Sequence, residues 1–196
     1  MHDISDQDIQ NIVQRVVRQS MGEKINLEIK TENHPDTTSS SDRVVAIGTD
    51  HGGVDLKETL KQVLIDNQYK VIDVGTHTKD PVDYPDIALA VAQRVASGEA
   101  WRGVIIDGAG IGSCMAANKV PGVRAALCYD YATAVNSREH NDANVLTLGA
   151  GLIGTALAKQ ILLTWLTTDF GGGRHAKRVD KIIAIEKRFL QDGMKS

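Results

Sequence analysis

Hydrophobic and polar positions alternate along most of the chain in blocks of two kinds. Some are short apolar runs with the length of a buried strand, and others are longer segments with an apolar stripe at helical spacing. The pattern predicts strands at 44–48, 70–74, 103–106, 123–128 and 145–148, and helices at 54–67, 84–96, 113–119, 131–139 and 153–167. Strands that alternate with amphipathic helices are typical of an α/β fold in which helices cover both faces of a parallel sheet.

The first 42 residues follow a different pattern. Residues 1–21 carry an apolar stripe at helical spacing, and residues 22–42 are polar and poor in apolar side chains. We therefore expect a short amphipathic helix, a flexible linker and one globular domain over residues 43–196. A helix this short needs a surface to dock on, which is a larger assembly, its own domain or another copy of the chain. The stripe consists of Ile9, Ile12, Val13, Val16 and Val17.

Composition narrows the class of protein. The formal net charge of −3 gives no reason to expect a nucleic-acid partner, and no apolar run is long enough to span a membrane. The N-terminus lacks the features of a cleaved leader, and Cys114 and Cys128 have no disulfide or metal-site spacing. We expect a cytoplasmic protein without a bound metal, whose partner is a small molecule or another protein.

Polar residues follow the predicted strands, at the edge where ligands bind in this class of fold. Asp50 and His51 follow the first strand, and the third strand ends in Asp107 and the loop Gly108–Ser113. The N–H groups of a glycine loop that leads into a helix stabilise an anion, and a carboxylate beside them favours proton transfer from a neutral carbon acid. The alternative is that Asp107 caps the following helix and the glycines only form a tight turn.

A second set of polar residues lies further along the chain. Arg174 and Arg178 are four positions apart, which places both guanidinium groups on one helical face as a clamp for a phosphate. The alternative is an ordinary solvated start of a helix. His51 and His140 also suit surface or capping roles, and Tyr84 is either core packing or a lid over a ligand.

Six motifs in this order resemble ribose-5-phosphate isomerase type B and the related galactose-6-phosphate isomerase subunits, from about residue 43 to residue 189. The resemblance implies a Rossmann-like three-layer α/β/α sandwich with a five-stranded parallel sheet. It implies a homodimer or a dimer of dimers with active sites shared between two subunits. It also implies interconversion of an aldose phosphate and a ketose phosphate through an enediolate, without a metal or other cofactor. The motifs are Thr49-Asp50-His51-Gly52-Gly53, Asp83-Tyr84-Pro85, Gly108-Ala109-Gly110-Ile111-Gly112, Ala116-Ala117-Asn118-Lys119, Ser137-Arg138-Glu139-His140-Asn141-Asp142-Ala143-Asn144 and Gly172-Gly173-Arg174-His175.

The resemblance assigns a role to each matching residue. His140 helps to open the sugar ring, and Arg174 and Arg178 hold the phosphate. Backbone groups of the glycine loop supply the oxyanion donors. The residues that line the sugar are Asp50, His51, Tyr84 and Asn141, and the loop positions are Gly108, Ala109, Gly110 and Gly112.

Two departures from the family pattern lie in the loop itself. Asp107 stands where these isomerases often carry a cysteine base, and Ala109 stands where a threonine is common. A carboxylate performs the same proton transfer, so we expect Asp107 to be the base. Ser113 partly replaces the missing threonine hydroxyl, whereas Cys114 lies beyond the loop and is no substitute for the cysteine.

A third departure concerns the substrate. The run Gly149-Ala150-Gly151-Leu152 lacks the arginine that many members have near Gly151. The sugar is therefore ribose 5-phosphate, a close pentose phosphate, or a sugar phosphate held by other cations. The alternative function is a catalytically silent protein that binds sugar phosphates or acts as a scaffold.

The N-terminal extension resembles the encapsulation peptides that direct enzymes into bacterial microcompartments. Those peptides are short helices whose apolar stripe packs on shell or cargo proteins. We therefore expect residues 4–21 to bind such proteins and to bring the enzyme into a microcompartment.

Overall fold

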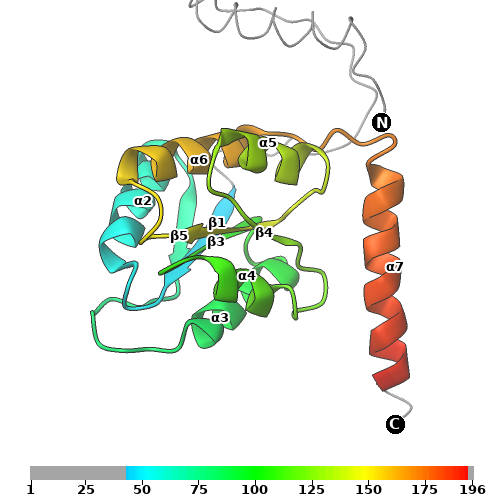
Figure 1. Ribbon diagram of the computed structural model, residues 1–196, viewed down its shortest axis with the longest axis horizontal. Helices are drawn as coiled ribbons and strands as arrows, with labels where there is room; N and C mark the ends of the chain where they lie inside the picture. Colours follow the sequence, from blue (N-terminus) through cyan, green and yellow to red (C-terminus); the bar gives the residue numbers. More distant parts are fainter. Residues whose placement is uncertain (1–42, 194–196) are drawn as a thin grey trace, which may run out of the picture. The chain divides into compact units, whose positions relative to one another are not determined.

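The computed structural model describes residues 43–193, in which strands and helices alternate along the chain (Figure 1). Five strands pair in parallel into one sheet in the order β2-β1-β3-β5-β4. Their bounds are β1 Val44–Thr49, β2 Lys70–Asp73, β3 Arg102–Asp107, β4 Ala125–Leu127 and β5 Val145–Gly149.

Helices cover both faces of the sheet, which gives the three layers of an α/β/α sandwich (Figure 1). One face carries α3 and α4, and the other carries α2, α5 and α6. The bounds are α2 Val54–Asp66, α3 Tyr84–Ala96, α4 Ile111–Ala117, α5 Tyr131–Glu139, α6 Thr155–Thr167 and α7 Ala176–Gly193.

Side chains alternate between the two faces of each central strand and so contribute to two cores. In β1, Val45 and Ile47 pack under α2 and α6, while Ala46 between them faces α3. In β3, Ile106 and Ile105 divide in the same way. This period of two explains why the central strands are continuous apolar runs in the sequence, because both faces are buried.

The strand order reverses between β1 and β3, since the chain goes from β1 outward to β2 and then crosses back to β3. A crevice forms outside the carboxyl ends of the strands at such a reversal. The backbone N–H of Asp50, just after β1, donates to the carbonyl of Ile106 in β3 at 3.2 Å. The residues that follow β1 and β3 are therefore neighbours at this edge.

The α/β fold and the five-stranded parallel sheet expected from the sequence are confirmed. Each of the ten predicted elements is present, with both ends within two residues of the expected positions. The long helix α7 was not among the predicted elements, and it begins at Ala176, so the expectation that Arg174 and Arg178 share one helical face is wrong. Arg174 lies in the turn before the helix, after Gly172 and Gly173 with left-handed backbones of φ 58° and 52°. The predicted helix at 1–21 and linker at 22–42 lie outside the described residues. Within residues 43–193, no helix combines the length and the apolar character needed to cross a bilayer.

Candidate active site

Asp107 is the last residue of β3 and lies at the strand reversal, at the head of the glycine loop. Its side chain is buried, with only 4% of the residue exposed. The loop turns back sharply after it, because Gly110 adopts a left-handed backbone with φ of 77°. The loop ends there, at the start of α4. A side chain at Gly110 would also meet Leu127 at 2.5 Å, so glycine is required there on two counts.

The loop folds around the Asp107 carboxylate. Oδ1 accepts hydrogen bonds from the N–H groups of Ala109, at 2.7 Å, and of Gly110, and Oδ2 accepts one from Ser113 at 3.1 Å. Three N–H groups of the loop that was expected to stabilise a ligand's oxyanion therefore donate to Asp107 instead. The reason is that the carboxylate is the nearest anion and lies inside the turn. The alternative in which Asp107 caps the following helix also fits, since Ser113 lies in the first turn of α4 and its N–H donates to Asp107.

Three further predicted site residues lie around this loop. Asp50 is buried, and its Oδ1 accepts the N–H of Gly52 at 2.9 Å. His51 is exposed, and its Nδ1 accepts the N–H of Val82 at 3.3 Å, which assigns the ring hydrogen to Nε2 as a donor for a ligand. Tyr84 lies over Gly112, because a Cβ there would come within 2.5 Å of the tyrosine ring. The structure thus brings Asp50, His51, Tyr84 and Asp107 to one edge of the sheet.

The residues after Gly112 turn away from this edge. Ser113 is fully buried, and its Oγ has no hydrogen-bond partner among the described residues. It reaches Asp107 through its backbone N–H alone. Burial raises the pKa of the Cys114 thiol, and the charge of Asp107 adds to this effect. Cys114 is therefore a poor nucleophile or base, in agreement with its place beyond the loop.

The other predicted residues gather at the opposite edge of the sheet. Helix α5 starts near the carboxyl end of β4 and runs back, so His140 and Asn141 follow it on the side where β5 begins. The segment before α7 joins them there, with the N–H of Gly171 donating to the carbonyl of Glu139 at 2.8 Å. His140 stacks on His175 with ring centroids 4.1 Å apart, and Arg174 Nε donates to His175 Nε2 at 3.3 Å.

Positive charge is concentrated at this second group. Partial burial lowers the pKa of His175, and the charges of His140, Arg174 and Arg178 lower it further. Arg174 and Arg178 themselves are exposed. Such a group of cations suits a phosphate dianion. One chain therefore carries an acid–base group at one edge and an anion-binding group at the other, and it does not bring them together.

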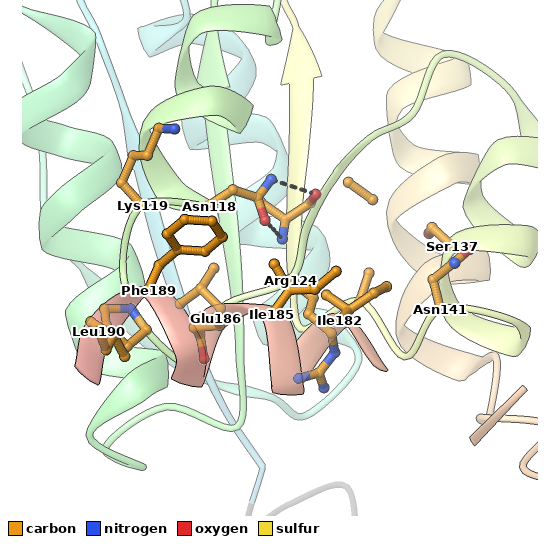
Figure 2. Close-up of a pocket in the computed structure, with 15 residues that line it drawn as sticks. Asn118, Lys119, Arg124, Ser137, Asn141, Ile182, Ile185, Glu186, Phe189 and Leu190 are labelled. Atoms are coloured by element: carbon orange, nitrogen blue, oxygen red, sulfur yellow. Dashed lines mark hydrogen bonds between the residues drawn. The ribbon is translucent and has the colours of Figure 1, made fainter. Parts of the chain in front are cut away.

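A groove of about 750 Å³ lies between α7 and the edge strand β4. Figure 2 shows Ile182, Ile185 and Phe189 of α7 directed at the segment that joins α4 to β4. These side chains are between 46% and 69% exposed, and the groove has Asn141 at its border but not Asp107. It is therefore an unfilled apolar surface next to the second group and not the place where Asp107 acts.

Three side chains near the end of β2, Glu58, Asp73 and His77, have the mutual spacing of a metal site. The ammonium groups of Lys57 and Lys61 already lie 2.9 and 2.8 Å from the Asp73 carboxylate. Burial works to raise the pKa of Asp73, but hydrogen bonds from Lys61 and Lys57 outweigh it and lower the pKa. A dication would be repelled by both lysines, so the cluster is an ion-pair network that fixes α2 to β2.

Comparison with known proteins adds the family. The Ribose/Galactose Isomerase family matches residues 45–182. Ribose-5-phosphate isomerase B of Escherichia coli is 44% identical over 144 residues, which are 74% of this chain and 97% of the relative. D-erythrulose-4-phosphate isomerase of Pectobacterium atrosepticum is 42% identical over 142 residues, 70% of this chain and 91% of the relative.

Solved structures give the same answer. Ribose-5-phosphate isomerase B of Clostridium thermocellum superposes with a TM-score of 0.74 and is 53% identical, over 74% of this chain and 99% of that one. The chain belongs to the Ribose/Galactose Isomerase family. It is an aldose–ketose isomerase, and the part that matches its relatives is the domain that begins at β1.

Proposed function

We propose that this enzyme interconverts ribose 5-phosphate and ribulose 5-phosphate through an enediolate, with Asp107 as the base. The observation that carries the proposal is the buried Asp107 carboxylate at the strand reversal, inside a glycine loop that leads into a helix. Support for the substrate comes from relatives named ribose-5-phosphate isomerase B that match nearly over their whole length.

Asp107 takes the proton from C2 of the open-chain aldose, and the C–H electrons form the C1=C2 bond of the enediolate. The electron pair of the carbonyl moves to O1, where the loop N–H groups that do not donate to Asp107, those of Gly108, Ile111 and Gly112, stabilise it. Asp107 then delivers a proton, which exchanges in part with solvent, to C1 while the O2 proton passes to O1, and C2=O forms to give the ketose. Each carboxylate oxygen has two lone pairs, so Oδ2, with one N–H donor, keeps a site for the proton.

The remaining residues bind and open the sugar. Asp50, His51 and Tyr84 line it beside the loop, Asn141 lines it from the other group, and His140 assists ring opening. Arg174 and Arg178 hold the phosphate by charge-assisted hydrogen bonds. The positive surroundings that lower the pKa of His175 support this assignment.

A homodimer, alone or paired into a tetramer, completes the site in this proposal. The two groups of residues lie at opposite edges of one sheet, so a partner must bring its His140 edge to this chain's Asp107 edge. The exposed apolar side chains of α7 offer a surface for that contact. A C2-symmetric pair would form two such sites at once.

Exchange of the C2 proton with solvent deuterium tests the reaction and the substrate together. Ribose 5-phosphate and allose 6-phosphate are followed by NMR at C2, and the ketoses xylulose 5-phosphate and erythrulose 4-phosphate, whose C2 is the carbonyl carbon, are followed at C1. We expect the highest kcat/KM for ribose 5-phosphate. A four-carbon preference would move the substrate toward that named for the Pectobacterium relative. Tight binding of all of them without exchange would show the silent sugar-phosphate binder, the second candidate, which the three backbone donors already on the Asp107 carboxylate favour.

Residues 4–21 give the enzyme a second property in our proposal, docking on shell or cargo proteins of a bacterial microcompartment. Support comes from the sequence, where an apolar stripe is separated from the isomerase domain by a polar stretch at 22–42. The helix then docks without disturbing the site that begins at Asp50.

A further inference from the structure

The peptide that joins Ala109 to Gly110 is held at both of its polar ends. Its N–H belongs to Gly110 and donates to Oδ1 of Asp107. Its carbonyl belongs to Ala109 and accepts a hydrogen bond from the Tyr129 hydroxyl at 2.6 Å. Tyr129 lies 20 positions further along the chain, just after β4, and packs its half-buried ring against the core cluster of β1, β3 and β5.

The surroundings leave this peptide a single orientation. Gly110 has the left-handed backbone that glycine adopts freely, so the peptide before it is free to rotate unless something fixes it. Gly149 faces the Ala109 carbonyl so closely that a Cβ there would lie 2.6 Å from its oxygen. A rotated peptide would aim that oxygen at the Asp107 carboxylate, and two acceptors repel each other. The Tyr129 hydroxyl is the donor that stabilises the observed orientation.

We infer that Tyr129 is a positioning residue for proton transfer, acting on Asp107 through the Ala109–Gly110 peptide. The hydroxyl fixes the carbonyl, the peptide N–H fixes Oδ1, and Oδ2 is thereby left in place for the C2 proton, so the inference rests on the proposed role of Asp107. Hydrogen bonds in such a chain also strengthen one another, by roughly 10–30% per bond. Neither effect requires Tyr129 to touch the sugar.

Tyr129→Phe removes the hydroxyl and keeps the ring in the core. We expect kcat to fall by about tenfold to a hundredfold, as for a base displaced by a fraction of an ångström, with KM unchanged within about twofold. The primary isotope effect on kcat with C2-deuterated ribose 5-phosphate is expected to rise, because the C–H step becomes slower than product release. Tyr131→Phe is the matched control, since its ring is 49% exposed and its change removes a hydroxyl only two positions away.

A double-mutant cycle separates this inference from the proposed role of Asp107. Asp107→Asn alone tests the base. Adding Tyr129→Phe to Asp107→Asn is expected to cost less than twofold more, because a residue that acts through Asp107 has nothing left to position. Wild-type kcat in Tyr129→Phe, the same loss in both backgrounds, or a lower kcat with an unchanged isotope effect would each overturn the inference. Full turnover in Asp107→Asn would instead overturn the base assignment.

Discussion

Two thiols in this enzyme have surroundings that keep them protonated. Burial raises the pKa of Cys128 to about 11, and burial also raises the pKa of Cys114. The thiolate is the form that reacts with alkylating agents, and its fraction is very small at neutral pH for such groups. We therefore expect iodoacetamide to leave kcat unchanged in the native enzyme, measured as residual isomerase activity against incubation time.

Asp107→Cys provides the contrast for this thiol experiment. It restores the residue type common in the family at a position surrounded by backbone N–H donors, which favour the thiolate. We expect this variant to retain some turnover and to lose it on alkylation. Loss of wild-type activity in step with labelling of Cys114, followed by mass spectrometry, would show that the thiol takes part after all.

At the scale of the elements, Arg102 ties the start of β3 to the end of α6. Its Nη1 donates to the carbonyls of Trp165 and Leu166 at 2.8 and 2.9 Å, and its guanidinium lies 3.9 Å from the Trp101 ring centroid. Burial, together with the charges of Arg138 and Arg43, lowers the pKa of Arg102 to about 9. The last carbonyls of a helix have no partner within it, so this side chain completes α6.

Arg102→Met is expected to lower the free energy of unfolding by about 2 kcal/mol, because two buried carbonyls lose their donor. The pKa of Arg102 is lower in the folded protein than in the unfolded chain. The cost of burying its charge is therefore fully present below about pH 9 and falls only above it, so the loss stays constant from about pH 6 to about pH 8. Urea unfolding at several pH values measures the loss of free energy and its constancy with pH.

Arg94→Met is the matched control, since the Arg94 side chain is partly exposed and forms an ion pair with the exposed Glu99 at 3.2 Å. We expect a change within about 0.5 kcal/mol there. An Arg102→Met protein as stable as the wild type would mean that relief of the buried charge outweighs the lost hydrogen bonds.

Periodicity alone was enough for the strands and for the layer arrangement, because each central strand is apolar on both faces. It also predicted where these two carboxylates lie, since Asp50 comes just after β1 and Asp107 is at the end of β3. The three N–H groups on Asp107 and the hydroxyl of Tyr129 on Ala109 were not predictable, because they depend on a left-handed turn at Gly110 and on a contact 20 residues apart. The position of His140 at the far edge of the sheet could be predicted from the order of the elements, because a helix that follows a parallel strand runs back toward the strand's start.

At the scale of the whole molecule, the split between the two groups of site residues has a direct consequence. A mixture of Asp107→Asn and His140→Asn subunits should regain activity that neither variant has. A mixed dimer contains one site with both changes and one with neither, so random reassociation gives about one quarter of wild-type activity. The measurement is isomerase activity after the two variants are unfolded and refolded together.

Asp107→Asn mixed with Asp50→Asn is the control for this experiment. Both residues lie at the same edge, so every site in the mixed dimer carries one change and no activity should return. Recovery by this pair, or none by the first pair, would contradict a site shared between subunits.

Deletion of residues 1–40 is expected to leave kcat/KM and the oligomer unchanged, because the isomerase domain begins with β1 at Val44. A reporter protein that carries residues 1–20 should concentrate in microcompartments of a host that makes the cognate shell. Replacing Ile12 and Val16 by aspartate in the reporter keeps the length and breaks the apolar stripe, so that reporter should stay diffuse. Loss of the dimer on truncation would make the segment a structural part of the enzyme.

Exchange of the C2 proton in Asp107→Asn tests the central claim most directly. The amide keeps the size of the carboxylate but does not accept the proton, and a positioned base contributes roughly two to four orders of magnitude to the rate. We expect deuterium incorporation into ribose 5-phosphate to fall by that factor, while calorimetry shows binding of the sugar phosphate within a few-fold of wild type. Exchange at the wild-type rate in Asp107→Asn would contradict the account.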